Sequence, residues 1–228
     1  MSDTDVRLGL SLNSYNDIRD RLRVRVMDYE SNKKKLENLV YIQASGGFAL
    51  VPYMILDDMQ DGAVANITKT MAQAMCIDGF TIIKNALDES VKRNPPVLRS
   101  ISSILNGNPT TRNLLDKAGP ENKLPNNALA SGMEFLVLTN EDSILGASVL
   151  YYPDVMRKVS DVVGGDYYVV PSSIHEVLIM PANAAITPYE LLTMVRDVNS
   201  SVVDDNDELA TRVLLYDAKT LDLRTIAE

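Results

Sequence analysis

The sequence predicts an α+β fold in which mainly antiparallel sheets pack against helices. Apolar residues make up 46% of the 228-residue chain and the mean hydropathy is −0.05, values typical of a globular protein with a sizeable core. In the second half of the chain, apolar runs of strand length alternate with amphipathic stretches of helical length. The order of these elements favours antiparallel connections, and we expect one compact domain overall.

Residues 1–45 are predicted to contribute a long amphipathic helix that packs on the core. In "RLRVRV" (21–26), arginines alternate with apolar residues, a period of two that by itself indicates a strand. Over the longer stretch 14–40, however, apolar residues recur at helical spacing, and Ser14 with Asp17 resembles an N-terminal cap. We therefore predict a helix over 14–40. The apolar positions behind this prediction are Ile18, Leu22, Val26, Tyr29, Leu36 and Val40.

Residues 46–94 are predicted to form a hairpin–helix unit. "FALVPYMILDD" (48–58) has the composition of a strand, in which Pro52 indicates an edge strand or a bulge. "AVANIT" (63–68) is the predicted returning strand. Two helices follow, and the second ends at Asn94 because two prolines come next. The predicted helical stretches are "KTMAQAMCI" and "GFTIIKNALDESVKRN".

Residues 95–132 are predicted to be a Pro/Asn-rich loop or linker. The stretch 94–132 holds five of the ten prolines and seven asparagines, a composition typical of irregular structure. A short helix is predicted around 98–105. Because connections of this length are usually mobile or functional, this segment is the predicted contact region for a partner.

Residues 133–228 are predicted to form an α+β core unit with the order ββαββαββ. "EFLVLTN" and "SILGASVLYY" are expected to pair as a hairpin, followed by a helix with Pro153 in its first turn and a glycine at its end. Two strands, a helix capped by Thr187 and a closing hairpin complete the unit. Whether this unit shares one sheet with residues 46–94 is left open.

The sequence indicates no cofactor and no metal site. Cys76 is the only cysteine, so the chain forms no internal disulfide, and we expect this residue to be buried as a small apolar side chain. With one cysteine and one histidine, a zinc site built from these residue types is excluded within one chain. Residues 197–208 approach a calcium-loop spacing, but Val202 stands where that loop requires glycine. The glycines form neither a P-loop nor a dinucleotide-binding motif.

The chain is acidic, with a net charge of −9, which disfavours direct binding to the phosphates of nucleic acids. The N-terminus lacks the basic and apolar regions of a signal peptide. No apolar stretch approaches the ~20 residues that a membrane-spanning helix needs. We therefore expect a cytoplasmic protein that does not contact a membrane, and leave its oligomeric state open.

"YYVVPSSIHEVLIMP" (167–181) contains the only histidine and is the stretch that most resembles a catalytic centre. A hydrolase would use Ser172 or Ser173 as nucleophile, His175 as base and a carboxylate that holds the imidazole. Glu176 is the nearest acid. In a strand it would face away from His175, and in a helical turn it would form a capping box with Ser173. We interpret the segment as a structural turn and keep these four residues as the alternative catalytic set.

Four stretches of the chain are "IRDRLRVRVMDYESNKKKLENL", "DGAVANITKTM", "LTNEDSILGASVLYYPDVMRKVSDVVGGDYYVVPSSIHEVLIMP" and "LLTMVRDVNSSVV". Together they resemble a bacterial family known only as domain of unknown function 5688, and the match covers residues 15–217 in order. The resemblance implies a cytoplasmic protein, often encoded near phage or mobile-element genes, with no established activity. Members usually carry an additional N-terminal region that this chain lacks. The family motif includes Pro171, Ser172, Ser173, His175 and Glu176.

These observations support three hypotheses about function. The favoured one is a non-enzymatic binding or regulatory module with a protein partner, which would serve a mobile element against host machinery. It depends on the few catalytic residue types, the acidic charge and the segment 95–132. The second is a hydrolase that uses Ser172 or Ser173 with His175. The third is an acidic protein that imitates nucleic acid.

Overall fold

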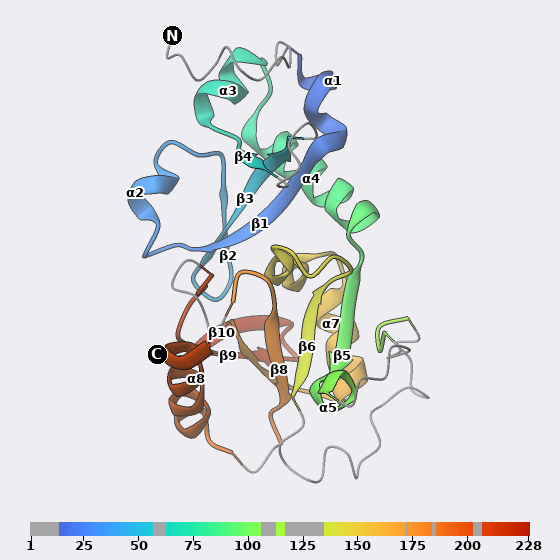
Figure 1. The fold of residues 1–228 in the computed structure, drawn as a ribbon, viewed down its shortest axis with the longest axis vertical. Coiled ribbons are helices and arrows are strands. Elements are labelled where there is room, and N and C mark those ends of the chain that lie inside the picture. The colour runs from blue at the N-terminus through green and yellow to red at the C-terminus, as the bar shows by residue number, and fades with distance from the viewer. Residues whose placement is uncertain are drawn as a thin grey trace.

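The structure is a computed structural model that describes residues 14–56, 63–105, 113–116, 135–171, 173–183, 186–202 and 207–228. These residues form two antiparallel sheets with helices packed on them, so the predicted α+β class is confirmed. Figure 1 shows the two sheets one above the other along the long axis of the molecule. A single hydrophobic cluster includes Val24 and Leu50 of the upper sheet and Leu138 and Leu214 of the lower one. The sheets therefore share one core.

The first sheet is built around a central strand, β3, which pairs with β1 on one side and with β2 and β4 on the other. Helix α4 packs against β1 and β3 and follows the short helix α3. Residues 46–94 contain β3, β4, α3 and α4 in that order. The elements are β1 (Leu22–Asp28), β2 (Ile42–Ala44), β3 (Phe48–Ile55), β4 (Val64–Asn66), α3 (Lys69–Ala74) and α4 (Gly79–Arg93).

The long helix predicted over residues 14–40 is wrong. The structure has two short helical turns, α1 (Tyr15–Ile18) and η1 (Arg19–Arg21), and then β1. In β1 the alternation of apolar and basic residues is the signal that decides, because every second side chain enters the shared core. Pairing of β1 with β3 supplies the backbone hydrogen bonds that a helix would otherwise make. Between the end of β1 and residue 40, the only helix is the single turn α2 (Lys33–Leu36).

Pro52 lies in the central strand β3, whereas the sequence indicated an edge strand or a bulge. It stands opposite Val24, whose N–H points away from β3 and donates to Ser90 Oγ of α4 at 2.9 Å. The Pro52 carbonyl accepts the Ile67 N–H at 3.0 Å on the side away from β1. Its nitrogen faces that same side, between the ends of β2 and β4, so the missing N–H interrupts no strand pairing.

The second sheet has the strand order β10-β9-β7-β8-β6-β5 and carries helices on both faces. Helix α7 contributes to the core shared with the first sheet, whereas α8 packs on the opposite face in a separate cluster. The Thr187 side chain caps α8 as predicted, and Gly164 ends α7 in a left-handed conformation. The elements are β5 (Pro96–Ser100), β6 (Leu136–Asn140), α7 (Val155–Val163), β7 (Tyr167–Val170), β8 (Val177–Pro181), α8 (Pro188–Val202), β9 (Val213–Asp217) and β10 (Asp222–Ala227).

Two predicted elements of this region differ in the structure. "SILGASVLYY" does not pair with β6 but forms the 3₁₀ helix η3 (Gly146–Tyr151). The strands that flank β6 are β8 and β5, and β5 lies within the predicted loop or linker 95–132. The short helix predicted around 98–105 is shorter and begins later, as α5 (Ile101–Leu105). The remainder of that segment lies outside the described residues except for 113–116.

The β2–β3 turn joins the two sheets. The Tyr151 hydroxyl donates to the carbonyl of Ser45 at 2.7 Å, and Arg212 Nη1 donates to the carbonyl of Gly46 at 3.1 Å. Gly47 has φ +82°, and a Cβ at this position would collide with the Arg212 guanidinium. The close contact between the sheets therefore requires glycine in this turn. The units 46–94 and 133–228 belong to different sheets that meet here.

Candidate functional site

The segment between β7 and β8 carries the candidate residues and is held by hydrogen bonds from three directions. The Ile174 N–H donates to the carbonyl of Asp207 at 2.8 Å, and the Ile174 carbonyl accepts the Ala147 N–H at 3.2 Å. Thr139 Oγ1 of β6 donates to the His175 carbonyl at 2.7 Å. Ser172 lies outside the described residues. The backbone around His175 is thus fixed by neighbours that are distant in sequence.

Both nitrogens of the His175 imidazole face groups of the protein. Nδ1 accepts the backbone N–H of Leu145 at 3.2 Å, and Nε2 lies 3.4 Å from Asp207 Oδ1. A nitrogen that accepts an N–H carries no proton, so we assign the proton of the neutral ring to Nε2, directed toward Asp207. The side chain keeps 34% of its surface exposed. The ring therefore links the Leu145 turn to the Asp207 segment.

The Leu145 N–H reaches the ring because the turn after β6 has an unusual shape. Leu145 itself adopts a left-handed conformation with φ +51°. The Asn140 side chain stabilises the turn through two hydrogen bonds. Its Oδ1 accepts the Ile144 N–H at 3.2 Å, and its Nδ2 donates to the Ile144 carbonyl at 2.8 Å. Gly146 follows, and a Cβ there would lie 2.5 Å from the His175 carbonyl oxygen and 2.8 Å from the Asn140 nitrogen. Only glycine allows this close approach.

The contacts of Ser173 and Glu176 differ from those that a catalytic set would make. Ser173 Oγ accepts the His175 backbone N–H at 3.0 Å, an arrangement typical of a turn. Within the described part of the chain, no hydrogen bond joins a serine hydroxyl to the imidazole, and none joins Glu176 to it. Burial raises the pKa of Glu176, an effect that the nearby His175 opposes. The roles considered for Ser172, Ser173, His175 and Glu176 remain predictions.

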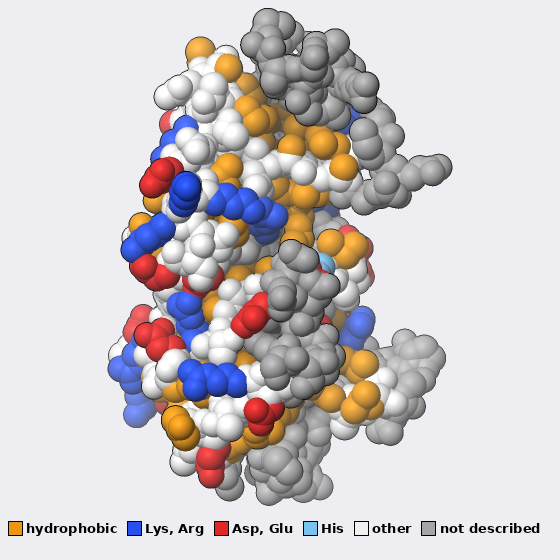
Figure 2. Space-filling view, turned by 60° about the vertical axis from the view of Figure 1, so that its left-hand side comes forward, with side chains coloured by type: hydrophobic (Ala, Val, Ile, Leu, Met, Phe, Trp, Pro, Cys, Tyr) orange, Lys and Arg blue, Asp and Glu red, His pale blue; other side chains and the backbone are white. Residues whose placement is uncertain are grey.

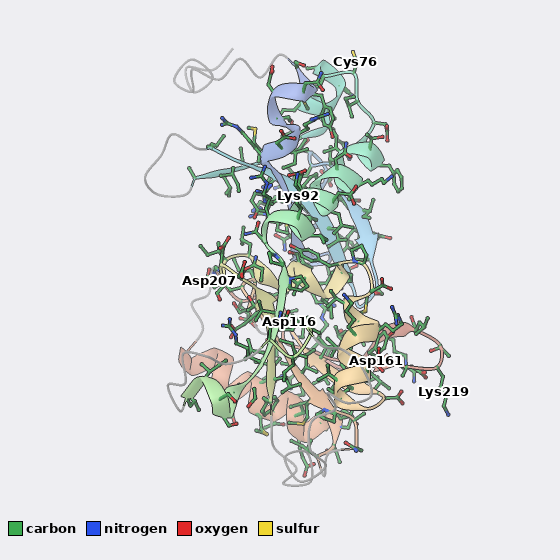
Figure 3. The ribbon with its side chains drawn as sticks, turned by 90° about the vertical axis from the view of Figure 1, so that its right-hand side faces the viewer. Cys76, Lys92, Asp116, Asp161, Asp207 and Lys219 are labelled. Carbon is green, nitrogen blue, oxygen red and sulfur yellow. The ribbon has the colours of Figure 1, made fainter. Side chains whose placement is uncertain are left out.

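Sequence reasoning missed Asp207 as the carboxylate that faces the histidine. Figure 3 shows Asp207 near the level at which the two sheets meet. The acidic run at 204–208 was visible in the sequence, but no spacing rule connects it with His175, because tertiary structure alone brings them together. Cys76, which was expected to be buried, is exposed and lies at the far end of the molecule.

A pocket of about 140 Å³ lies between the two sheets beside this segment. Its lower wall includes Leu145 and Ile174, the residues whose backbones the bonds described above hold in place. Its upper wall comes from β1 and the residues that follow it. Figure 2 shows that basic and hydrophobic side chains adjoin on the side of the molecule that carries the histidine. The lining residues are Arg25, Val26, Met27, Asp28, Asn32, Lys35, Leu145, Ile174, Glu208 and Leu209.

Arg25 is the most unusual residue of this pocket. Its Nε is fully buried and has no hydrogen-bond partner, and Nη2 contacts only the Met27 sulfur, at 3.8 Å. Burial lowers the pKa of the guanidinium below its usual value. Asp28, which also lines the pocket, is instead paired with Arg212. Arg25 is therefore a largely buried cation without a carboxylate among the residues that the structure describes.

Comparisons with known proteins place the chain by sequence. A family model described as "Family of unknown function (DUF5688)" matches residues 3–218. No curated protein and no solved structure matches the chain.

Among the described residues, no group of three or more His, Cys, Asp or Glu side chains is arranged to hold a metal ion. None of the helices in the described ranges has the length and apolar character needed to cross a membrane.

Proposed function

We infer that this chain, which belongs to the DUF5688 family of unknown function, is a non-enzymatic binding module. The observation that carries this proposal is the use of both imidazole nitrogens of His175. A general base must offer an unprotonated nitrogen to the hydroxyl that it activates. In His175 that nitrogen, Nδ1, already accepts the Leu145 N–H, and Nε2 is turned toward Asp207. This geometry favours a structural role for the ring over a catalytic one.

The position of the ring supports a binding role for the neighbouring pocket. The bonds of His175 and Ile174 hold one wall of a pocket that lies between two sheets. Ligand sites are often found at such boundaries, where few polar groups converge on a largely preformed cavity. In this proposal, His175 and Asp207 maintain the shape of the pocket, and the ligand binds beside them. A protein partner and a regulatory role in a mobile-element setting are further parts of the same proposal.

Two measurements on the purified protein test this function. The first is covalent labelling with a fluorophosphonate reagent, which reacts with activated serines. We expect no labelling that depends on His175 or Asp207, because the ring offers no free nitrogen to a hydroxyl. The second is native mass spectrometry of protein taken from its own cells, in which we expect a bound ligand or partner that denaturation releases.

The labelling experiment needs matched variants. His175→Gln removes the imidazole, and Asp207→Asn removes the carboxylate that faces it. The control is Asp161→Asn, which changes an exposed acid on α7 that lies far from Asp207 in Figure 3. Serine labelling that is lost in the first two variants and kept in the third would establish a hydrolase and overturn the proposal.

A further inference from the structure

We propose that the pocket between the two sheets binds the oxyanion of an organic ligand, a phosphate or a carboxylate, through Arg25 and Lys35. This inference rests on the binding function proposed above and names the chemical class of the ligand. Neither the family description nor any similar protein assigns a ligand to these residues. It depends on the charges of the pocket, on the partners that its acids already have, and on its apolar wall.

Arg25 differs from its neighbours because its Nε has no acceptor and its Nη2 donates only to a sulfur among the described residues. On the same strand, Arg23 donates from Nε to Asn94 Oδ1 at 2.9 Å and from Nη1 to the Leu22 carbonyl at 2.7 Å. Arg212, which does not line the pocket, pairs with Asp28, which does. A buried cation without an acceptor weakens a fold, so such a group in a native protein calls for a functional explanation. Because Nε itself is fully buried, an anion in the pocket would bind the terminal nitrogens of the guanidinium, Nη1 and Nη2.

Lys35 adds a second cation to the same pocket. It belongs to α2, which follows β1 in sequence, and its side chain is exposed. Its neighbour Lys33 pairs with Glu30 at 2.6 Å, whereas Lys35 has no ion pair within the described part of the chain. Two cations from different elements therefore line one small cavity. This arrangement raises the local concentration of anions even though the whole chain is acidic.

The acids of the pocket offset these cations only in part. Asp28 binds the Arg212 guanidinium, which balances its charge, and also accepts the Ser31 N–H at 2.8 Å. Glu208 accepts the hydroxyl of Thr211, a neutral group, and keeps its own charge. Arg25 and Lys35 together therefore exceed the remaining acid of the pocket by one positive charge.

The size and the walls of the pocket define the ligand further. A volume of about 140 Å³ is many times the ~10–15 Å³ of cavity that one water molecule needs, so an oxyanion with a small substituent fits. A guanidinium binds phosphate and carboxylate groups through two parallel hydrogen bonds. Leu145, Ile174 and Leu209 offer apolar contacts on the lower wall. We therefore expect an organic anion with an apolar group beside its oxyanion, in preference to a bare inorganic ion.

The test uses phenyl phosphate and benzoate as probes, each at constant ionic strength with chloride as the balancing anion. Binding is followed through the Arg25 Nε–H signal in ¹H–¹⁵N spectra and through the melting temperature. We expect at least one probe to shift this signal and to raise the melting temperature of the wild type. Phenyl phosphate acting alone would identify a phosphate ligand, and benzoate acting alone a carboxylate ligand.

Three variants separate this site from general charge effects. Arg25→Met should abolish the response, and Lys35→Ala should weaken the affinity at least tenfold. Lys34→Ala, an exposed neighbour that does not line the pocket, should leave it unchanged. If Arg25→Met does not fold, Arg25→Lys replaces it, with a loss of at least tenfold expected because the two-pronged geometry is gone.

The opposite results are equally clear. Equal affinity in Lys34→Ala and Lys35→Ala, or no response of the wild type to either probe at about 10 mM, would overturn the oxyanion site. If native mass spectrometry still finds a ligand in that case, the binding function stands and only its ligand class is wrong. His175-dependent serine labelling would instead remove the binding function itself.

Discussion

The guanidinium of Arg212, which precedes β9, forms an ion pair with the carboxylate of Asp28 at the end of β1. The Asp28 side chain is only 3% exposed and that of Arg212 13%, so the pair is shielded from solvent. Arg212 also lies over the Phe48 ring, 5.2 Å from its centroid. One side chain thus joins the second sheet to β1 and β3 of the first.

Removal of Asp28 is expected to lower stability strongly. Asp28→Ala leaves the shielded Arg212 without its anion, and breaking a buried pair from one side costs about 3–5 kcal/mol. The free energy of unfolding from urea titration measures the effect. Glu30→Ala is the matched control, because its pair with Lys33 is exposed and should contribute less than about 1 kcal/mol. A loss for Asp28→Ala no larger than that of the control would contradict the assigned role.

A methyl group at Gly146 is expected to disrupt the turn beneath His175. The new Cβ would lie 2.5 Å from the His175 carbonyl oxygen, which forces the backbone to move at a cost of about 1–3 kcal/mol. Thermal unfolding of Gly146→Ala measures the loss. Gly79→Ala is the control, since its Cβ would meet only a side-chain methyl of Val40 at 3.1 Å. Equal melting temperatures for the two variants would show that the turn adapts freely.

Replacement of His175 should release the Leu145 amide. His175→Leu removes the acceptor of that N–H, and an unsatisfied, partly buried donor costs about 1–3 kcal/mol. His175→Asn keeps an acceptor near the position of Nδ1, so its loss should be smaller. Amide hydrogen exchange gives the direct readout, with faster exchange at Leu145 in the leucine variant than in the asparagine variant. Unchanged protection of the Leu145 amide in both variants would contradict its hydrogen bond to His175 Nδ1.

Glu176→Gln should stabilise the protein at neutral pH. Burial raises the pKa of Glu176 in the folded state above its usual value, so the folded protein binds this proton more readily than the unfolded chain. The ionised carboxylate therefore weakens the fold above the folded pKa, and stability recovers as the pH falls through it. Glutamine never ionises, and the gain should be below about 1 kcal/mol because solvent still reaches the site.

The pH dependence distinguishes this effect from a packing change. The difference between wild type and Glu176→Gln in urea titrations should shrink as the pH falls from 7 toward 4.5, because the Glu176 carboxyl of the folded protein becomes protonated and neutral like glutamine. Glu190→Gln should behave in the opposite way, because hydrogen bonds from Thr187 lower the pKa of Glu190 and its charge favours the folded state. A gap for Glu176→Gln that does not change with pH would contradict the explanation.

Local signals were sufficient for several elements. The helix α8 was predicted from Thr187 at its cap and Pro188 at its first position, and α7 from Pro153 and a terminal glycine. The glycine ends α7 as predicted, but the helix begins at Val155, so Pro153 precedes its first turn. The strands β7 to β10 were predicted from short apolar runs. In each of these cases the residues that specify the element lie within it, so interactions between near neighbours are enough.

The candidate site was only partly accessible from the sequence. The chain has a single histidine, and the segment around it was identified at once. Its contacts with Leu145 and Asp207, however, come from segments about 30 residues away on either side, and no local periodicity reports them. Arg25 looked like one arginine of an amphipathic helix, and its isolation in a pocket depends on where Asp28 and Arg212 meet.

The amino-acid sequence by itself determined the α+β class, most helix ends and the polar turn around His175, because capping, turn chemistry and hydrophobic alternation act over a few residues. Pairing with β3 decided that residues 22–28 form the strand that their local alternation indicates, against the helical spacing of the longer stretch. Tertiary structure alone decided that β5 completes the second sheet and that Asp207 faces the imidazole. Each of these outcomes depends on backbone hydrogen bonds or charges supplied by a distant segment. Their free energy enters only when the two sheets pack together.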